Sequence, residues 1–152
     1  MISPGLLPLG ADRWTPFVAT LNLIGADLTS AVLVSQVRLY RDATGDPLVA
    51  LAQVESGSSE GVRLIYAGSD TVANHITAGR LTEAPAGYVS GDTLAMTQIG
   101  IRINETTMEG LPAAGKAGAD VELAWDIHIT PSGGLKGKWL YGPFTVRSGV
   151  TR

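Results

Sequence analysis

Residues 121–130 alternate between apolar and mostly polar side chains without a break. The apolar positions in this run are Val121, Leu123, Trp125, Ile127 and Ile129. Strict period two places successive side chains on opposite faces of an extended chain, so the run predicts a strand with one buried face. Pro131 and Gly133 then supply turn chemistry, and residues 135–147 return as a second strand. The sequence therefore predicts an antiparallel hairpin over residues 121–147.

The rest of the chain is divided into short segments by 19 glycines and 8 prolines. Short segments bounded by turn residues are typical of strands rather than long helices. Further strands are predicted at residues 16–24, 31–40, 48–54, 62–66 and 94–103. About seven strands joined mostly by short turns favour an all-β fold, an antiparallel β-sandwich, with an open barrel as the alternative.

One or two short helices are expected between the strands. Thr71 is a candidate N-cap for a helix at about residues 72–79, and Asn104 for a single helical turn through Met108. Residues 68–91 are the least regular stretch of the chain. We therefore predict an insertion there, which carries the first helix.

The length of 152 residues fits one domain with a core of its own. We expect an extended N-terminal arm at residues 1–15 and a single sandwich domain over residues 16–152. Charged residues make up 16% of the chain, against about 25% in typical soluble domains. Hydrophobic residues make up 45%. This composition predicts that a partner covers part of the surface.

Several classes of partner are not expected. The basic residues do not cluster, which argues against a nucleic-acid-binding surface. The apolar stretches are broken well before the ~20 residues that a membrane-spanning helix needs. The chain has no cysteine, which excludes disulfides, thiolate metal ligands and cysteine nucleophiles.

The residue patterns of common active sites are also missing. His75 and His128 have no second ligand at metal-binding spacing, and His128 is interpreted as an exposed strand histidine. The glycine-rich residues 133–138 lack the spacing of a phosphate loop, and residues 42–46 lack the later acids of a calcium loop. Glu122 and Asp126 fall on the polar face of a strand. We therefore predict no catalytic residue, no metal and no cofactor, and expect a protein that is not an enzyme.

Two groups of apolar residues are candidates for a protein interface. The arm contains Leu6, Leu7, Leu9 and Trp14, and we expect these side chains to pack on a neighbouring molecule, because burying one leucine contributes roughly 1.5–3 kcal/mol. Trp139 and Tyr141 lie two apart on the polar side of the last strand, so we expect them on one face. The alternative is that this face is covered within the domain.

Several turn and strand segments carry a resemblance to a known family. They are residues 25–31 with 37–40, residues 42–48, residues 101–103 with 107–112, and residues 125–134 with 141–146 and 149–151. Together these segments resemble the immunoglobulin-like N-terminal domain of baseplate upper proteins, which belong to the baseplates and fibre connectors of tailed phages. The resemblance covers about two thirds of the chain.

The resemblance implies a structural role. Such domains anchor a host-recognition device to the virion and carry no active site. The expected partners are other virion proteins of the tail, baseplate or fibre, with further copies of the chain in a trimer or hexamer. The expected location is the virion, assembled in the cytoplasm of the bacterial host. The position stays open between tail tip, fibre base, neck and head. A carbohydrate-binding module that contacts the host surface is the alternative function.

Overall fold

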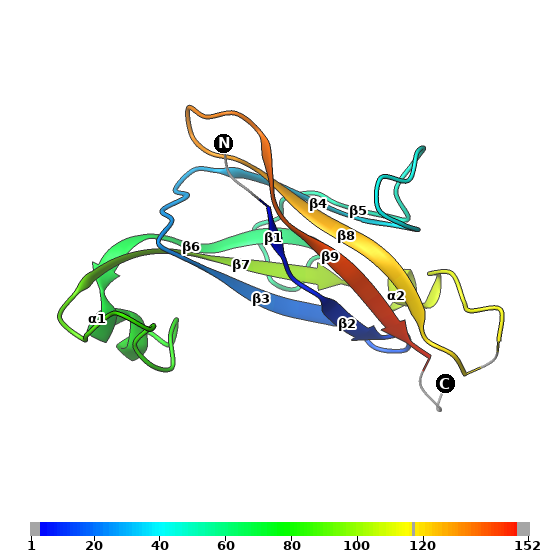
Figure 1. Cartoon of the computed structure of the whole chain (residues 1–152), viewed down its shortest axis with the longest axis horizontal. Coiled ribbons are helices and arrows are strands. Elements are labelled where there is room, and N and C mark those ends of the chain that lie inside the picture. Colours follow the sequence, from blue (N-terminus) through cyan, green and yellow to red (C-terminus); the bar gives the residue numbers. More distant parts are fainter. Residues whose placement is uncertain (1–3, 117, 149–152) are drawn as a thin grey trace.

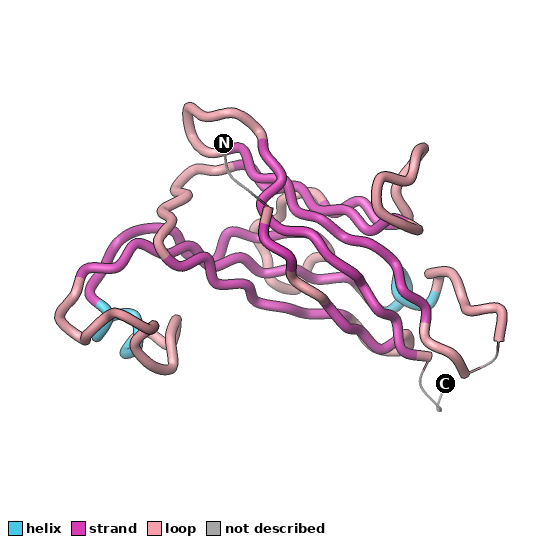
Figure 2. The backbone as a smooth tube through the Cα atoms, viewed as in Figure 1, coloured by secondary structure: helices cyan, strands magenta, loops and turns pink. Residues whose placement is uncertain are grey.

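The computed structural model describes residues 4–116 and 118–148. Strands dominate this part of the chain, and the helices are short (Figure 2). The strands are β1 (Gly5–Leu6), β2 (Leu9–Asp12), β3 (Phe17–Ile24), β4 (Val32–Arg38), β5 (Val49–Leu51), β6 (Gly61–Thr71), β7 (Thr93–Ile103), β8 (Val121–Thr130) and β9 (Gly137–Arg147). The helices are α1 (Val72–Thr77) and α2 (Glu105–Glu109).

The strands form two sheets in a sandwich-like arrangement (Figure 1). The first sheet has the order β1–β9–β8–β4–β5, with β2 also paired to β9. The second has the order β3–β7–β6. Strands β1 and β2 run parallel to β9, and all other paired strands are antiparallel. The prediction of an all-β, mainly antiparallel fold is confirmed.

The core lies between the two sheets. Leu33, Ile127 and Phe144 enter it from the first sheet and Ile99 from the second, and each is at most 1% exposed. The rings of Phe17 and Phe144 meet edge to face across the interior, with centroids 5.2 Å apart. This geometry suits the charge distribution of aromatic rings.

The predicted hairpin over residues 121–147 is confirmed as β8 and β9. Val121 pairs with Val146 at one end of the ladder, and Ile129 pairs with Gly137 at the other. The alternating positions of β8 are buried from Leu123 to Ile129, as the period-two pattern requires. Because both strands place one face on the core, a slip of one residue would turn the apolar set toward water.

The other predicted strands appear as β3, β4, β5, β6 and β7, with shifted ends. The largest difference is in β6, which runs to Thr71 instead of ending at Tyr66. Its extension pairs with the start of β7 as far as Thr93. The sequence does not predict this extension, because its residues are mostly polar and lack an alternating apolar face. Pairing with β7 keeps the stretch extended instead.

Both predicted helices are present. The Oγ1 atom of Thr71 accepts a hydrogen bond from the backbone N–H of Asn74, so Thr71 caps α1 as expected. Gly79, with φ of +79°, follows the helix where most other residues would be strained. Asn104 precedes α2 but makes no side-chain capping bond.

The N-terminal residues lie differently from the extended arm that the sequence suggests. Strands β1 and β2 join the first sheet of the same chain by pairing with β9. Between them, the Leu7 N–H donates to the Tyr141 carbonyl at 2.8 Å, and the Leu7 carbonyl accepts from Trp125 Nε1 at 2.8 Å. A Cβ atom at Gly142 would clash with the Leu7 backbone, so Gly142 permits this close approach. A one-sided apolar pattern does not reveal whether the side chains pack on the chain itself or on a neighbour.

Candidate functional site

A groove with a volume of about 250 Å³ lies on the outer face of the first sheet. Asp126 of β8 stands in its middle, paired with Gln36 of β4 on one side and Tyr141 of β9 on the other. The next cross-strand row repeats the arrangement around Ala124. We call this site the outer groove and define it by Gln36, Arg38, Ala124, Asp126, Tyr141 and Pro143. Its floor is fixed by strand pairing, so it is preformed.

Two segments wall the outer groove. Residues 39–42 follow β4 and form one wall, where the Arg41 guanidinium lies 4.7 Å from the centroid of the Tyr141 ring. Leu6 of β1 pairs with Tyr141 and contributes to the lining with a side chain that is 64% exposed. A cation over an aromatic face gains about 0.5–1 kcal/mol at exposed sites, so Arg41 can be displaced at modest cost.

The charges around the outer groove balance. The lining carries three cations and three anions, which are Arg38, Arg41 and Lys138 with Asp42, Glu122 and Asp126. Asp126 Oδ2 is 3.8 Å from Lys138 Nζ. Asp126 Oδ1 is buried and has no hydrogen-bond partner among the residues that the structure describes. Buried polar atoms are usually hydrogen-bonded, so this oxygen is an unsatisfied acceptor under the groove, on a side chain that is 18% exposed as a whole.

Trp139 and Tyr141 do not share a face, contrary to the sequence-based expectation. The β8–β9 ladder shifts register between Ile127 and His128, so that Trp139 has no partner residue on β8. Trp139 packs against the core with Leu140, whereas Tyr141 lines the outer groove. The bulge turns the Trp139 side chain toward the core. A prediction that assumes strict alternation along the strand does not include such a bulge.

A second polar site lies on the second sheet, at the end where β6 stops and β7 begins. Residues 72–92 fold back onto these two strands there. Leu94 and Met96 of β7 alternate with the core residues and so face away from the sandwich interior. Both are at most 1% exposed, as are Val72 and His75 of α1. The insertion therefore covers this end of the sheet and buries a small apolar group outside the main core.

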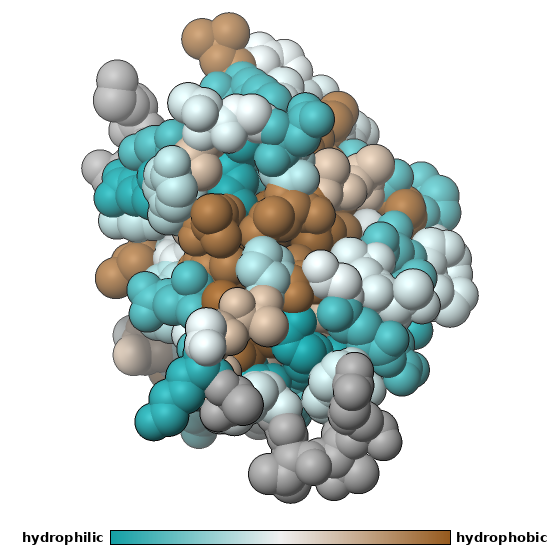
Figure 3. Space-filling view, turned by 90° about the vertical axis from the view of Figure 1, so that its right-hand side faces the viewer, coloured by the Kyte–Doolittle hydropathy of each residue, from teal (hydrophilic) through white to brown (hydrophobic). Residues whose placement is uncertain are grey.

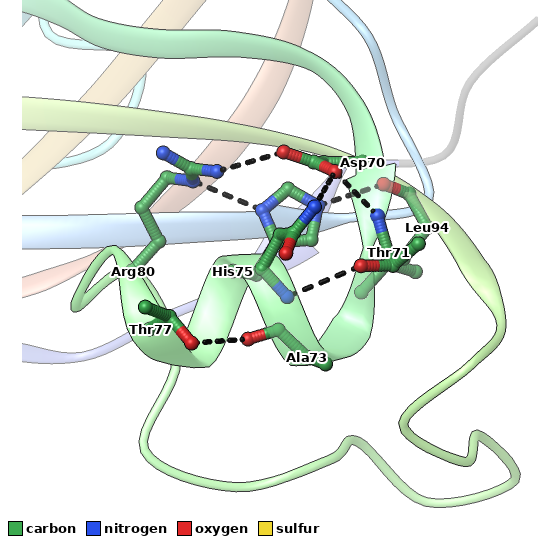
Figure 4. Close-up of polar contacts among 8 residues, drawn as sticks. Asp70, Thr71, Ala73, His75, Thr77, Arg80 and Leu94 are labelled. Atoms are coloured by element: carbon green, nitrogen blue, oxygen red, sulfur yellow. Dashed lines mark hydrogen bonds and ion pairs between the residues drawn. The ribbon is translucent and has the colours of Figure 1, made fainter.

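His75 is the centre of a closed network in this group (Figure 4). Arg80 Nε donates to His75 Nδ1 at 2.9 Å, and His75 Nε2 lies 2.9 Å from the Leu94 carbonyl oxygen. Arg80 also lies 3.8 Å above the Tyr66 ring and 3.7 Å from Asp70 Oδ2. We call Tyr66, Asp70, His75 and Arg80 the tip cluster.

The contacts of the tip cluster determine which ring nitrogen of its histidine accepts and which donates. An arginine Nε always carries hydrogen, so His75 Nδ1 must accept, and Nε2 must carry the proton donated to Leu94. The carboxylate of Asp70 accepts hydrogen bonds from the Asn74 side chain and from the backbone N–H of Thr71. These bonds hold the carboxylate in place, and they lower the pKa of Asp70. The sequence gives no sign of this network, which joins residues from a strand, a helix and a loop.

His128 lies beside the outer groove rather than fully in solvent. Its Nδ1 atom is 4.0 Å from Asp126 Oδ1, and its side chain is 25% exposed. Partial burial lowers the pKa of His128, Asp126 opposes that effect, and Lys136 and Lys138 lower the pKa further. The interpretation of an exposed strand histidine is corrected to a half-buried one, because its polar neighbours on β8 and β9 crowd the same face.

The arm residues predicted for an interface divide into two groups. Leu7 and Leu9 pack against the core of their own chain. Leu6 is largely exposed at the edge of the outer groove, and Trp14 is half-buried. The site residues that sequence reasoning missed are Asp126 and Gln36, for which the only signal was their position in the polar register of two predicted strands.

Two further findings concern the described residues as a whole. Among residues 4–116 and 118–148, no three histidine, aspartate or glutamate side chains lie close enough together to hold a metal ion. Within the same residues, no helix has the length and apolar character needed to cross a membrane.

Comparison with known proteins gives no further assignment. No protein-family model matches the sequence. No curated protein matches it at a significant level.

Proposed function

We propose that this chain is a structural protein of a tailed-phage virion, which works through protein–protein assembly at the tail tip, the baseplate or the attachment point of a fibre. The neck and the head are the alternative positions. The resemblance of its turn and strand segments to baseplate upper proteins suggests this role. The arrangement of the strands supports the fold on which that resemblance depends.

The strand order is the observation that carries the proposal. If β3, β4, β5, β6, β7, β8 and β9 are lettered B, C, C′, D, E, F and G, one sheet has the order G–F–C–C′ and the other B–E–D. This is the sheet composition of immunoglobulin-like sandwiches with a C′ strand. The N-terminal strands add to strand G. We therefore propose that the sandwich is immunoglobulin-like, as expected for this phage domain.

Exposed apolar side chains support assembly as the mode of action. The loop between β4 and β5 exposes Leu39, Tyr40 and Leu48 by 50%, 60% and 40%. At the same end of the molecule, apolar residues form a central patch surrounded by polar ones (Figure 3). Patches of this kind mark interaction sites on soluble proteins. We propose that this end contacts another virion protein.

Purified phage particles provide the test. Tailed-phage particles whose genome encodes the chain are isolated on a density gradient, analysed by mass spectrometry, and labelled with gold-coupled antibodies against the chain. We expect the chain in intact particles, with label at the tail end. Label at the neck or head supports the alternative position. Absence of the chain from intact particles contradicts the proposal.

The outer groove favours a second candidate function, the binding of a neutral saccharide. Tyr141, Ala124 and Pro143 offer an aromatic and apolar floor, and the carboxylate of Asp126, whose side chain is 18% exposed, offers an acceptor for a hydroxyl group. The balanced lining charges favour a ligand without net charge. A glycan array with the intact chain should give hits that Tyr141→Ala abolishes. Tyr88→Ala, which alters an exposed tyrosine outside the groove lining, should keep them. An array without hits contradicts this function.

A further inference from the structure

The two edges of the β3–β7–β6 sheet are built differently. Strand β6 carries devices that protect an edge: a register shift between Leu64 and Tyr66, the charged residues Arg63 and Asp70, and hydrogen bonds between Val62 and the neighbouring residues 52–54. Soluble proteins use bulges, charges and covering segments to prevent edge strands from pairing with other chains. The β6 edge is therefore closed to a partner over much of its length.

Strand β3 has none of these devices. Its sequence, FVATLNLI, contains no charge, no proline and no glycine over eight residues. It forms the free border of its sheet, at the lower side of Figure 1. Val18 is 63% exposed and Ile24 is 41% exposed. An uncharged and partly apolar edge of this length is expected to pair with another strand.

The register identifies which backbone groups are open. Gly25 N donates to Ala95 O at 2.7 Å, one step beyond the pair formed by Ile24 and Met96. Because antiparallel strands alternate between hydrogen-bonded and non-hydrogen-bonded pairs, the odd-numbered residues of β3 bond to β7. The backbone N–H and C=O groups of Val18, Thr20, Asn22 and Ile24 then point to the open edge. Among residues 4–116 and 118–148, none of these groups has a hydrogen-bond partner.

We propose that β3 pairs with β3 of a second copy of this chain, antiparallel and about a two-fold axis. One register uses all the open backbone groups at once. It places Val18 opposite Ile24 of the second copy and Thr20 opposite Asn22 of the second copy. Apolar side chains then meet apolar ones, and two hydrogen-bonding side chains meet each other. The two three-stranded sheets become one continuous sheet across the dimer.

A second copy fits this edge because β3 is complementary to itself. Across a two-fold axis, if residue i of one copy contacts residue j of the other, then residue j of the first copy contacts residue i of the second. The edge sequence must therefore read the same from both ends, and the order apolar, polar, polar, apolar at residues 18, 20, 22 and 24 does so. The pairing does not depend on the proposed virion role, since it follows from the edge alone.

The first test is the mass of the intact chain in solution. Sedimentation velocity over a concentration series should show a concentration-dependent species of twice the 15.8 kDa chain mass. A chain that stays monomeric at high micromolar concentration overturns the proposal.

Two double variants then test the register. Thr20→Lys with Asn22→Lys places like charges opposite each other across the axis and should raise the dissociation constant of the dimer roughly tenfold or more. Thr20→Lys with Asn22→Glu places opposite charges there and should keep the dimer. Both double variants lose the Asn22 bonds to Gln98 and Arg80, so their folding is compared by circular dichroism.

Ser69→Lys is the matched control, because Ser69 is an exposed residue on the opposite edge strand β6. It should leave the dimer unchanged. A dimer that resists the double-lysine variant, or that Ser69→Lys disrupts instead, overturns the assignment to β3.

Discussion

The tip cluster and the outer groove are both polar sites on the outer faces of the sandwich, but they differ in how completely their polar groups are satisfied. In the tip cluster, both nitrogens of His75 are hydrogen-bonded and Arg80 contacts an imidazole, an aromatic ring and a carboxylate. In the outer groove, Asp126 keeps one buried oxygen without a hydrogen-bond partner among the described residues. A satisfied network stabilises a fold, whereas an unsatisfied one leaves interaction capacity for a ligand.

The largest expected effect is the loss of the histidine at the centre of the tip cluster. His75→Ala leaves the Leu94 carbonyl and Arg80 without their partner and opens a cavity, so we expect the free energy of unfolding to fall by about 3 kcal/mol. Urea denaturation followed by circular dichroism measures this change. His128→Ala is the control, with an expected loss below about 1 kcal/mol. Equal losses in the two variants would remove the distinction between the sites.

A smaller effect is expected from the carboxylate of the tip cluster. Asp70→Asn keeps the shape but removes the charge that faces Arg80, so the variant should be less stable than the parent at neutral pH. The folded-state pKa of Asp70 is lowered, so its contribution is complete above the ordinary value of about 4 and is lost as the pH falls through the lowered value. Thermal melting of both proteins from pH 7 to pH 2 should show their difference shrinking only in the acid range. A difference that does not change with pH contradicts this assignment.

A weaker pH dependence is expected beside the outer groove. Because folding lowers the pKa of His128, the unfolded chain takes up the proton first as the pH falls below about 6.5. The parent protein should therefore lose stability between pH 7.5 and pH 5.5, and His128→Gln should lose less. The difference should stay below about 1 kcal/mol, because water screens a partly exposed side chain. Parallel stability curves for the two proteins would contradict the predicted effect.

The smallest effect is expected inside the outer groove. Asp126→Asn removes only the long charge contacts to Lys138 and His128, at 3.8 and 4.0 Å, and keeps the side-chain shape, so the free energy of unfolding should change by no more than about 0.5 kcal/mol. A loss of several times that size, measured by urea denaturation, would mean that Asp126 stabilises the fold as His75 does.

The sequence predicts those parts of the fold that depend on local pattern. The period-two run of β8 and the Thr71 cap of α1 are visible in short stretches of sequence, because strands and caps need only a few neighbouring residues. The sequence predicts the outer groove only in part. The sequence identifies Tyr141 as a candidate, but it places the acidic residue opposite it, Asp126, on a solvated strand face.

The parts that were missed depend on contacts distant in sequence. Residue 7 and residue 125 meet through a hydrogen bond that no local pattern indicates, and the bulge at Trp139 follows from fitting one strand to its neighbour. His75 is fully buried because an insertion folds back over two strands. Contacts between residues so far apart in sequence cannot be derived from the local pattern of one sequence.

The sequence by itself determined that this protein is built from strands with one apolar face, since alternation and turn residues act within a few positions. The tertiary structure decided which apolar residues turn inward, because the arm pairs with β9 instead of extending from the domain. It also decided which polar groups are left open, because strand register brings Asp126 beside Tyr141 and strand order leaves one edge of β3 without a paired strand among the described residues. Register is a property of two strands together, so neither strand specifies it alone.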